Sequence, residues 1–517
     1  MTPPAPDTAR VVTVDASWVP GRPPTGPTAF LATASGLHPA GAHGALPDVR
    51  GTDVPGAGAR GAGRAPRRGA AARTSADTAA TRTSADTAAA STVSDTAATR
   101  TTSDGAVVRD APVVLPELHL AGTVLPAFAD AHVHLGLVDA TALVPHGIAA
   151  VHDLGWIPDA AAGWAAEAGR SAGASRLPDV LFAGAFLTAP GGYPSDRSWA
   201  PAGSVVEVAT PADAVAAVDR QAAAGASCVK VALNAVAGPV PDDATLAALV
   251  ARAHERGVPV VAHSEGPGQA ERAFAAGVDR LAHAPFSERL PDALLAAMAG
   301  ASHHDGTSAM TWVSTLDIHG WGAPTPEHDV AVDNVRRFVA AGGTVVYGTD
   351  LGNGPLPVGV NARELRALAA AGLGPDALLR ALTSGPPRRA ERRVPAREMR
   401  PGTHPSRTDA ALATLAGAAV TFVPGPPPDV LTGLTELAGR TDPAGRTDRA
   451  GHADPADPAD RTDRTDRAGH ADRADLDRLD VGALTRWLSR ATTLHLADVL
   501  HPGFVPPSAT TTRKDQP

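Results

Sequence analysis

Short apolar runs alternate with amphipathic segments through the middle of the chain. Thr210, Pro211 and Asp213 have the types and spacing of a helix start, with a capping threonine, a proline in the first turn and an acid at its third position. The helix that they predict ends at Gly225, and the apolar run at 228–233 is typical of a buried strand. The same order of helix, glycine and strand recurs further along the chain. This order predicts an α/β fold with parallel strands.

Eight apolar runs of this kind occur within about 250 residues, which is the size of a (β/α)8 barrel. They lie at residues 124–132, 149–152, 180–183, 228–233, 258–263, 280–283, 309–315 and 344–348. We therefore predict a (β/α)8, TIM-like barrel of the α/β class over residues 124–384. A doubly wound open sheet is the alternative, although no glycine-rich phosphate loop follows the first strand.

Two flanking stretches are almost free of large apolar residues. Between residues 55 and 105 Val93 is the single large aliphatic residue, and residues 439–475 contain no Val, Leu, Ile, Phe or Trp. Such sequence buries too little apolar surface to offset the entropy cost of ordering the chain. We therefore predict low-complexity, disordered inserts at 37–105 and 437–478.

The segments beside these inserts contain further β-like runs, of which residues 10–14 and 418–423 are the clearest. They predict a small accessory β-domain that both ends of the chain build, followed by a C-terminal helix and tail. The expected parts of this domain are residues 1–36, 106–123 and 385–436, and the helix and tail are residues 479–517.

Composition and charge limit the classes of partner. Lys plus Arg number 45 against 54 Asp plus Glu, so the net charge is −9, which argues against a nucleic-acid partner. The chain has one cysteine, Cys228, and no apolar run of the ~20 residues that a membrane span needs. The segment after Met1 lacks the features of a secretory leader. We expect a cytoplasmic protein with neither a nucleic-acid nor a membrane partner, and a homo-oligomer is left open.

Polar side chains follow several of the apolar runs, at the ends of strands where the active sites of barrels form. His132 and His134 end the first run, and residues two apart in a strand point to the same side, so both imidazoles can reach one ion. Four further candidates stand at the ends of later runs: Lys230, His263, His283 and Asp350. Polar residues at the same end of five apolar strands favour a metal site.

Lysine usage points separately to Lys230. The chain has 45 basic residues but only two lysines, Lys230 and Lys514. Because arginine supplies positive charge elsewhere, a lysine within an apolar strand indicates a need for an amine. Burial lowers the pKa of an amine and permits covalent chemistry that a guanidinium does not perform. A lysine that pairs with an acid or extends from the strand end is the alternative.

The ordered set of motifs resembles the amidohydrolase superfamily, in its imidazolonepropionase-like and prolidase-like branch. The P-G-F-I-D-x-H-x-H signature of that superfamily is similar to Pro126-Ala127-Phe128-Ala129-Asp130-Ala131-His132-Val133-His134, with alanine where glycine is usual. Its later strands are similar to HGIAAVHDLG from His146, VAHSEG from Val261, LAH from Leu281 and GTDLGN from Gly348. The resemblance covers about residues 124–384. The departures from the family pattern leave every candidate ligand in place.

The resemblance implies a site for two divalent ions, expected to be Zn²⁺, with iron, manganese or cobalt as alternatives. The side chains that would hold them are His132, His134 and Asp350 for one ion, His263 and His283 for the other, and a Lys230 carboxylated by CO₂ as the bridge. Asp350 would also carry a proton to the leaving nitrogen.

The implied activity is that of a metal-dependent amidohydrolase acting on a small-molecule substrate. It would cleave a non-peptide or dipeptide-like C–N (amide) bond by attack of a metal-bound hydroxide. One alternative is a mononuclear imidazolonepropionase-like hydrolase or deaminase, which needs no bridging lysine, and another is a non-catalytic barrel scaffold. We also expect Tyr193 and His319, which follow the third and seventh strands, to contact the substrate.

Overall fold

Two compact units make up the chain, one formed by residues 1–39 with 116–517 and the other by residues 40–115. The structure is a computed structural model that describes residues 10–22, 24–33, 36–39, 99–101, 107–109, 117–170, 177–300, 309–384, 419–428, 481–500 and 504–507. In the second unit β4 (Thr99–Thr101) pairs antiparallel with β5 (Val107–Arg109). The first unit holds all the other elements.

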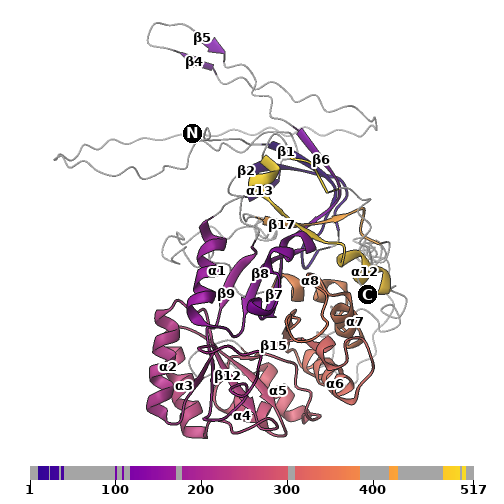
Figure 1. Ribbon diagram of the computed structural model, residues 1–517. Helices are drawn as coiled ribbons and strands as arrows, with labels where there is room; N and C mark the ends of the chain where they lie inside the picture. Colours follow the sequence, from indigo (N-terminus) through magenta and orange to yellow (C-terminus); the bar gives the residue numbers. More distant parts are fainter. Residues whose placement is uncertain are drawn as a thin grey trace, which may run out of the picture. The chain divides into compact units, whose positions relative to one another are not determined.

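Two sheets of parallel strands form the centre of the first unit (Figure 1). One has three strands in the order β7-β8-β9, and the other has seven in the order β11-β10-β12-β13-β14-β15-β16. The strands are β7 (Phe128–Val133), β8 (Ile148–Asp153), β9 (Asp179–Phe182), β10 (Phe186–Thr188), β11 (Val205–Glu207), β12 (Val229–Asn234), β13 (Val260–Glu265), β14 (Arg280–Leu281), β15 (Thr311–Val313) and β16 (Thr344–Val346).

Backbone hydrogen bonds also join these two sheets at two places. Ala131 of β7 donates to the carbonyl oxygen of Tyr347, just after β16, at 3.0 Å. Ser227, just before β12, donates to the carbonyl oxygen of Phe182 in β9 at 2.8 Å. The first bond connects β7 to the segment after β16, and the second connects β9 to the segment before β12.

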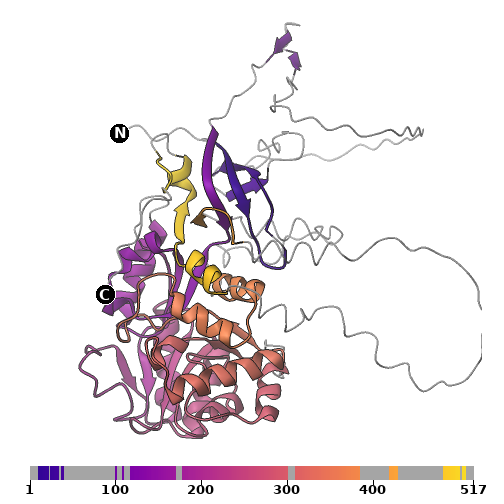
Figure 2. The ribbon, with the colours of Figure 1, turned by 90° about the vertical axis from the view of Figure 1, so that its right-hand side faces the viewer.

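Helices follow most of these strands and pack around them (Figures 1 and 2). The α-helices are α1 (Pro158–Arg170), α2 (Pro211–Ala223), α3 (Asp243–Glu255), α4 (Gln269–Ala275), α5 (Asp292–Gly300), α6 (Pro326–Ala340), α7 (Ala362–Ala370) and α8 (Pro375–Thr383), and the 3-10 turns are η2 (Leu135–Leu137), η3 (Ala140–Ala142), η4 (Val144–His146) and η5 (Leu316–His319). The predicted cap of α2 is confirmed, since the N–H of Asp213 donates to Thr210 Oγ1 at 3.2 Å. Within the described residues, no helix has the length and apolar content needed to cross a membrane.

A third sheet, of six strands, draws on both ends of the chain. Its order is β18-β17-β6-β1-β2-β3, and its pairs are antiparallel except for β1 with β6. Thr421 Oγ1 in this sheet accepts a hydrogen bond from the backbone N–H of Phe128, the first residue of β7, at 3.0 Å. The strands and the two helices beside them are β1 (Arg10–Ser17), β2 (Thr28–Thr33), β3 (Gly36–Pro39), β6 (Glu117–Leu125), β17 (Ala419–Pro424), β18 (Thr492–His495), α12 (Val481–Leu488) and α13 (Leu496–Leu500).

The strand expected at 124–132 is divided in the structure. β6 ends at Leu125 in the six-stranded sheet, and β7 begins at Phe128 in the parallel sheet. Pro126 between them has no backbone N–H for sheet pairing, so the chain passes from one sheet to the other there. The other seven expected strands are confirmed, with bounds that differ by a few residues.

The inserts expected at 37–105 and 437–478 lie outside the described residues, apart from residues 37–39 and 99–101. The same holds for residues 385–418, in the expected C-terminal part of the small domain. Cys228, the single cysteine, is buried, and its Sγ lies 3.1 Å from His152 Nε2.

Trp312 of β15 is fully buried, and its ring stacks on Phe338 of α6 with ring centroids 3.9 Å apart. We predict that Trp312→Ala lowers the free energy of unfolding by about 3–5 kcal/mol, because it leaves a cavity between strand and helix. Trp312→Phe should cost less than about 1.5 kcal/mol, since it keeps a stacked ring and removes a buried indole N–H that has no partner among the described residues. Urea unfolding followed by circular dichroism measures both, and equal losses would contradict the importance of the stack.

Candidate metal centre

The ends of the parallel strands and the turns that follow them line one cavity of about 570 Å³. All eight side chains that the sequence indicated line this cavity: His132, His134, Tyr193, Lys230, His263, His283, His319 and Asp350. The structure therefore brings together every position chosen from the sequence. What each of them binds stays a prediction.

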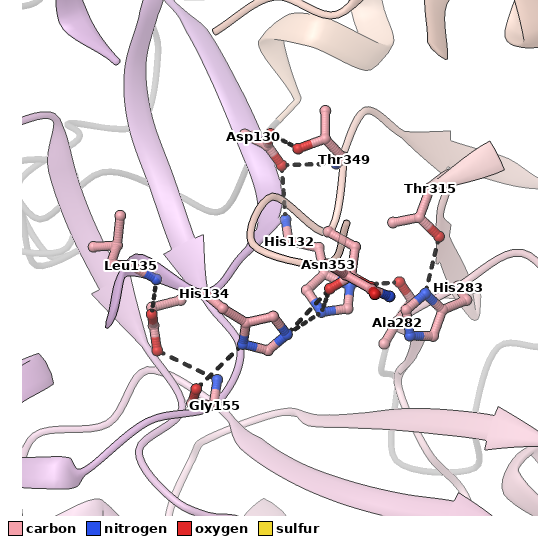
Figure 3. Close-up of polar contacts among 12 residues, drawn as sticks. Asp130, His132, His134, Leu135, Gly155, Ala282, His283, Thr315, Thr349 and Asn353 are labelled. Carbon is pink, nitrogen blue, oxygen red and sulfur yellow. Dashed lines mark hydrogen bonds and ion pairs between the residues drawn. The ribbon is translucent and has the colours of Figure 1, made fainter. Parts of the chain in front are cut away.

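Three polar atoms converge at the end of β7 (Figure 3). The Nε2 atoms of His132 and His134 lie 3.3 Å apart. Asp350 Oδ1 lies 3.0 Å from the first and 3.1 Å from the second, and all three side chains are buried. Asp350 has a φ of 58°, in the left-handed region where a non-glycine residue is uncommon. This backbone conformation, just after β16, places the carboxylate against the two rings.

Backbone carbonyl groups fix the tautomers of both imidazoles. His132 Nδ1 lies 2.9 Å from the carbonyl oxygen of Ala282, and His134 Nδ1 lies 3.2 Å from that of Gly155 (Figure 3). A carbonyl oxygen only accepts, so each Nδ1 carries the hydrogen and each Nε2 presents a lone pair. Burial also lowers the pKa of His132 well below its ordinary value, which keeps that ring neutral. With both imidazoles neutral, the three converging atoms are all acceptors.

Three acceptors so close together in a buried place repel one another unless a cation lies among them. Two ligands of a tetrahedral zinc ion, with bonds of about 2.0–2.1 Å, stand about 3.3 Å apart. The separations of the three atoms, from 3.0 to 3.3 Å, are close to that value. The residues present therefore fit a divalent metal ion.

His283 belongs to the same cluster. It forms a group with His132 and Asp350 in which one potential ligand atom from each residue lies within 4.8 Å of the others. Its Nδ1 lies 3.0 Å from Thr315 Oγ1, a contact that orients the ring (Figure 3). Burial lowers the pKa of His283 well below its ordinary value, so this imidazole is also neutral.

His263 lies beside His283 but has different partners. The two ring centroids are 4.9 Å apart, and His263 Nε2 lies 3.2 Å from Glu265 Oε2. This hydrogen bond lowers the pKa of Glu265, which is therefore an anion at neutral pH and an acceptor for Nε2–H. Asn234 Nδ2 lies 3.1 Å from the same Nε2, so this nitrogen accepts from Asn234 in one tautomer and donates to Glu265 in the other.

Lys230 is fully buried in β12, on the wall that the histidines share. Burial lowers its pKa to about 8, although the nearby carboxylate of Asp350 acts in the opposite direction. Its ammonium group has no hydrogen bond or close ion pair to any described residue. A buried ammonium without a partner is costly, so burial makes the neutral amine more accessible near neutral pH than it is for a lysine in water.

No protein-family model and no curated protein matches the sequence. Among solved structures, a Xaa-Pro dipeptidase with methionine bound in its active site is similar, with a TM-score of 0.51 and 15% identity over 81% of this chain and 94% of that one. An amidohydrolase (TM-score 0.48, 16% identity, 81% and 92% covered) and the ochratoxinase of A. niger (0.49, 14%, 73% and 83%) also match. The chain therefore shares the fold of the Xaa-Pro dipeptidase.

Asp130, beside the cluster, is a residue that the sequence analysis did not single out. Its Oδ1 accepts hydrogen bonds from the backbone N–H groups of His132 and Thr349, each at 3.0 Å, and its Oδ2 accepts from Thr349 Oγ1 at 2.6 Å (Figure 3). Burial raises the pKa of Asp130 to about 7 despite these bonds. Asp130 thus ties β7 to the residue before Asp350. Its signal in the sequence is an acid two residues before His132 in an apolar strand.

A loop between β10 and β11 supplies aromatic rings to the cavity. Tyr193 stacks on His263, with centroids 5.2 Å apart and planes at 28°, and Trp199 lies 6.2 Å from the ring of His134. Arg197 places its guanidinium 5.5 Å from the centre of the Tyr193 ring. The sequence indicated Tyr193, while Trp199 and Arg197 went unnoticed because a loop has no periodic pattern that would show which side chains face inward.

Removal of the Asp130 carboxylate tests whether it positions the cluster. We predict that Asp130→Ala weakens zinc affinity about tenfold to hundredfold and lowers the free energy of unfolding by about 2–4 kcal/mol, because two buried N–H groups lose their acceptor. Asp130→Asn should retain most of both, since its amide oxygen still accepts from His132 and Thr349. Chelator competition and urea unfolding measure the two effects. Unchanged zinc affinity in Asp130→Ala would show that the bridge does not orient the ligands.

Proposed function

We propose that the chain is a member of the amidohydrolase superfamily, a metal-dependent hydrolase that cleaves the C–N bond of an amide. The observation that carries this proposal is the convergence of His132 Nε2, His134 Nε2 and Asp350 Oδ1, which lie 3.0–3.3 Å from one another in a buried place. The ordered strand-end motifs and the shared fold support the same function. A non-catalytic scaffold gives no reason for such a cluster.

A closed (β/α)8 barrel is part of this proposal. The hydrogen bond from Ala131 to Tyr347 connects the first and last parallel strands, and that from Ser227 to Phe182 connects the two sheets on the other side. Closure would bring the carboxyl ends of all eight strands around the cavity, which is where barrel enzymes place their catalytic groups.

The candidate ligands divide by position into two groups. In the two-ion form, the ligands are His132, His134 and Asp350 for one ion, His263 and His283 for the other, and a carboxylated Lys230 between them. Nitrogen and carboxylate ligands favour zinc, although iron, manganese and cobalt accept the same set. When bound, the ions would supply a Lewis acid for the substrate carbonyl and would activate a water molecule.

Asp350 is the residue that we assign to proton transfer. Its Oδ2 accepts a hydrogen bond from Asn353 Nδ2 at 2.8 Å, which holds the carboxylate plane while Oδ1 faces the histidines. The carboxylate would take the proton of the attacking water at Oδ1 and give it to the leaving nitrogen, so that the amine departs neutral. Tyr193 and His319, on two sides of the cavity, would contact the substrate.

A mononuclear hydrolase or deaminase is the second candidate. In its favour, His132, His283 and Asp350 form a group whose potential ligand atoms lie within 4.8 Å of one another, and His263 Nε2 faces Glu265. Such an enzyme needs no bridging lysine. Metal stoichiometry separates the two candidates, with two ions per chain for the first and one for the second.

A substrate panel tests the proposed reaction. Zinc-loaded protein should hydrolyse at least one of the N-acyl amino acids, dipeptides or hydantoin-like rings, and a chelator should abolish that activity until zinc is returned. We predict that Asp350→Asn lowers kcat by at least about 100-fold while it keeps much of the zinc, since it removes the proton carrier and only one ligand charge. Metal analysis beside the kinetics is essential. Near-parental turnover by Asp350→Asn would exclude this residue as the proton carrier.

Lys230→Arg tests the bridge, because a guanidinium neither loses its proton nor forms a carbamate. We predict that this variant binds less zinc than the parent and lacks the carbamate signal that ¹³C-bicarbonate gives in carbon NMR of the parent. At equal concentrations of dissolved CO₂, carbamate should form faster at pH 9 than at pH 6, since a pKa of about 8 leaves about 1% neutral amine at pH 6 and about 90% at pH 9. Lys514→Arg, which changes the other lysine, is the matched control. Two ions and full turnover in Lys230→Arg would show that no carbamate bridge is needed, and one ion with full turnover would favour the mononuclear candidate.

A further inference from the structure

One wall of the cavity is apolar and aromatic, in contrast to the wall that carries the candidate ligands. The loops after β14 and β15 contribute Phe286, Ile318, His319 and Trp321 to it. The rings of Phe286 and His319 are in contact, with centroids 4.2 Å apart and planes at 40°. These four residues, here called the aryl wall, stand outside the proposed ligand set.

Exposure of apolar side chains is concentrated at this cavity. Among the described residues, four large apolar side chains are exposed: Leu137, Val236, Trp321 and Val505. Two of the four, Val236 at 69% and Trp321 at 45%, line the cavity. An exposed tryptophan at the edge of a pocket is unfavourable in water and becomes favourable when an apolar group covers it.

The turn that carries the aryl wall is held by a buried polar network. Asp317, within η5, donates its backbone N–H to Glu364 Oε2 at 2.7 Å, and its carboxylate accepts from Asn361 Nδ2 at 2.8 Å and Arg363 Nε at 2.9 Å. Its carbonyl oxygen also accepts from the backbone N–H of Trp321 at 2.7 Å. Burial of such charged groups costs free energy. The network holds the turn in one conformation, which reduces the ordering that ligand binding would otherwise require.

None of the three partner side chains of Asp317 lines the cavity. The network therefore acts on the cavity through the residues that follow Asp317 in the same turn. These residues are Ile318, His319 and Trp321. Trp321 itself has a φ of 49°, a left-handed conformation that the surrounding bonds maintain. The rigid backbone at this point fixes where the three side chains stand.

A single polar atom of the aryl wall lacks a partner. His319 Nε2 is buried and has no hydrogen bond within the described part of the chain. Burial lowers the pKa of His319 to about 4, so the ring is neutral near pH 7 and has one donor and one acceptor nitrogen. Pockets for small molecules commonly combine apolar walls with one or two such polar groups that orient the ligand.

We propose that the aryl wall is a subsite for an aromatic substituent of the substrate, one that carries a hydrogen-bonding atom for His319 Nε2. The proposal deepens the proposed function and rests on it, since the amide would lie against the candidate ligands while its aryl group lies against Phe286 and Trp321. The substrate class that follows is an aryl amide with a polar ring substituent, rather than a small alkyl amide.

Kinetics on matched substrates test this subsite. The zinc-loaded parent should hydrolyse 4-hydroxyacetanilide with a higher kcat/KM than N-methylacetamide, and Trp321→Ala should reduce the ratio of the two values about tenfold. Zinc content should not change in Trp321→Ala. Val505→Ala removes another exposed apolar side chain, 82% exposed and outside the cavity, and should leave the ratio as it is. An unchanged ratio in Trp321→Ala would overturn the proposal.

A binding measurement keeps the subsite separate from the reaction. The full-length protein should broaden the fluorine NMR line of 4-fluoroacetanilide, and 4-hydroxyacetanilide should reverse the broadening by displacing this ligand. Trp321→Ala should weaken the affinity for 4-fluoroacetanilide about tenfold. His319→Phe keeps the ring contact with Phe286 but removes the nitrogen, so it should abolish the preference for the hydroxylated over the unsubstituted anilide.

The two failures are distinguishable. The protein could bind the fluorinated anilide, with weaker binding in Trp321→Ala, and hydrolyse no amide. That result would contradict the proposed function and support the subsite. Hydrolysis of small amides without binding of the anilide would overturn the subsite and support the hydrolase. A preference for 4-hydroxyacetanilide that persists in His319→Phe would overturn the role given to His319.

Discussion

Three lone pairs that face one another at the end of β7 are the constraint on which the site depends. His132 Nε2, His134 Nε2 and Asp350 Oδ1 form a repulsive group in a buried place, where water does not screen them. The protein holds this group together by backbone contacts instead of by contacts among the three. The carbonyl groups of Ala282 and Gly155 fix the rings, and Asp130 fixes the backbone on both sides. The arrangement is stable when a cation completes it.

The parallel strands separate two tasks in space. Side chains at the strand ends make up the candidate ligand set, and their positions follow from sheet register, which tolerates little change. The aryl wall stands on turns beyond the strands, held by Asp317 and its partners. Because the turns are anchored independently, the group that is recognised can differ between related chains without disturbance of the ligands.

Much of this organisation follows from local sequence rules. The period of two in a strand placed His132 and His134 on one side, and the order of helix, glycine and strand led to the remaining ligands at later strand ends. The role of Asp130 could not be found this way, since its partner Thr349 is 219 residues away and the contact exists only once the strands are neighbours. The sequence did not indicate Trp321 as a cavity residue for another reason. It belongs to an irregular turn whose conformation is set by buried side chains of α7, and no periodic pattern records that dependence.

The hydrogen bond between Thr421 Oγ1 and the N–H of Phe128 has a consequence for the order of assembly. It joins residues 293 positions apart, and β6, directly before β7, likewise pairs with β17. During synthesis β7 emerges early, yet its first residue gains this bond only after residue 421 has been made. Pairing between such distant segments is slow to form. The strand that bears His132 and His134 therefore gains this bond late. A nascent chain that stops before β17 lacks the bond at the start of the strand that carries these two candidate ligands.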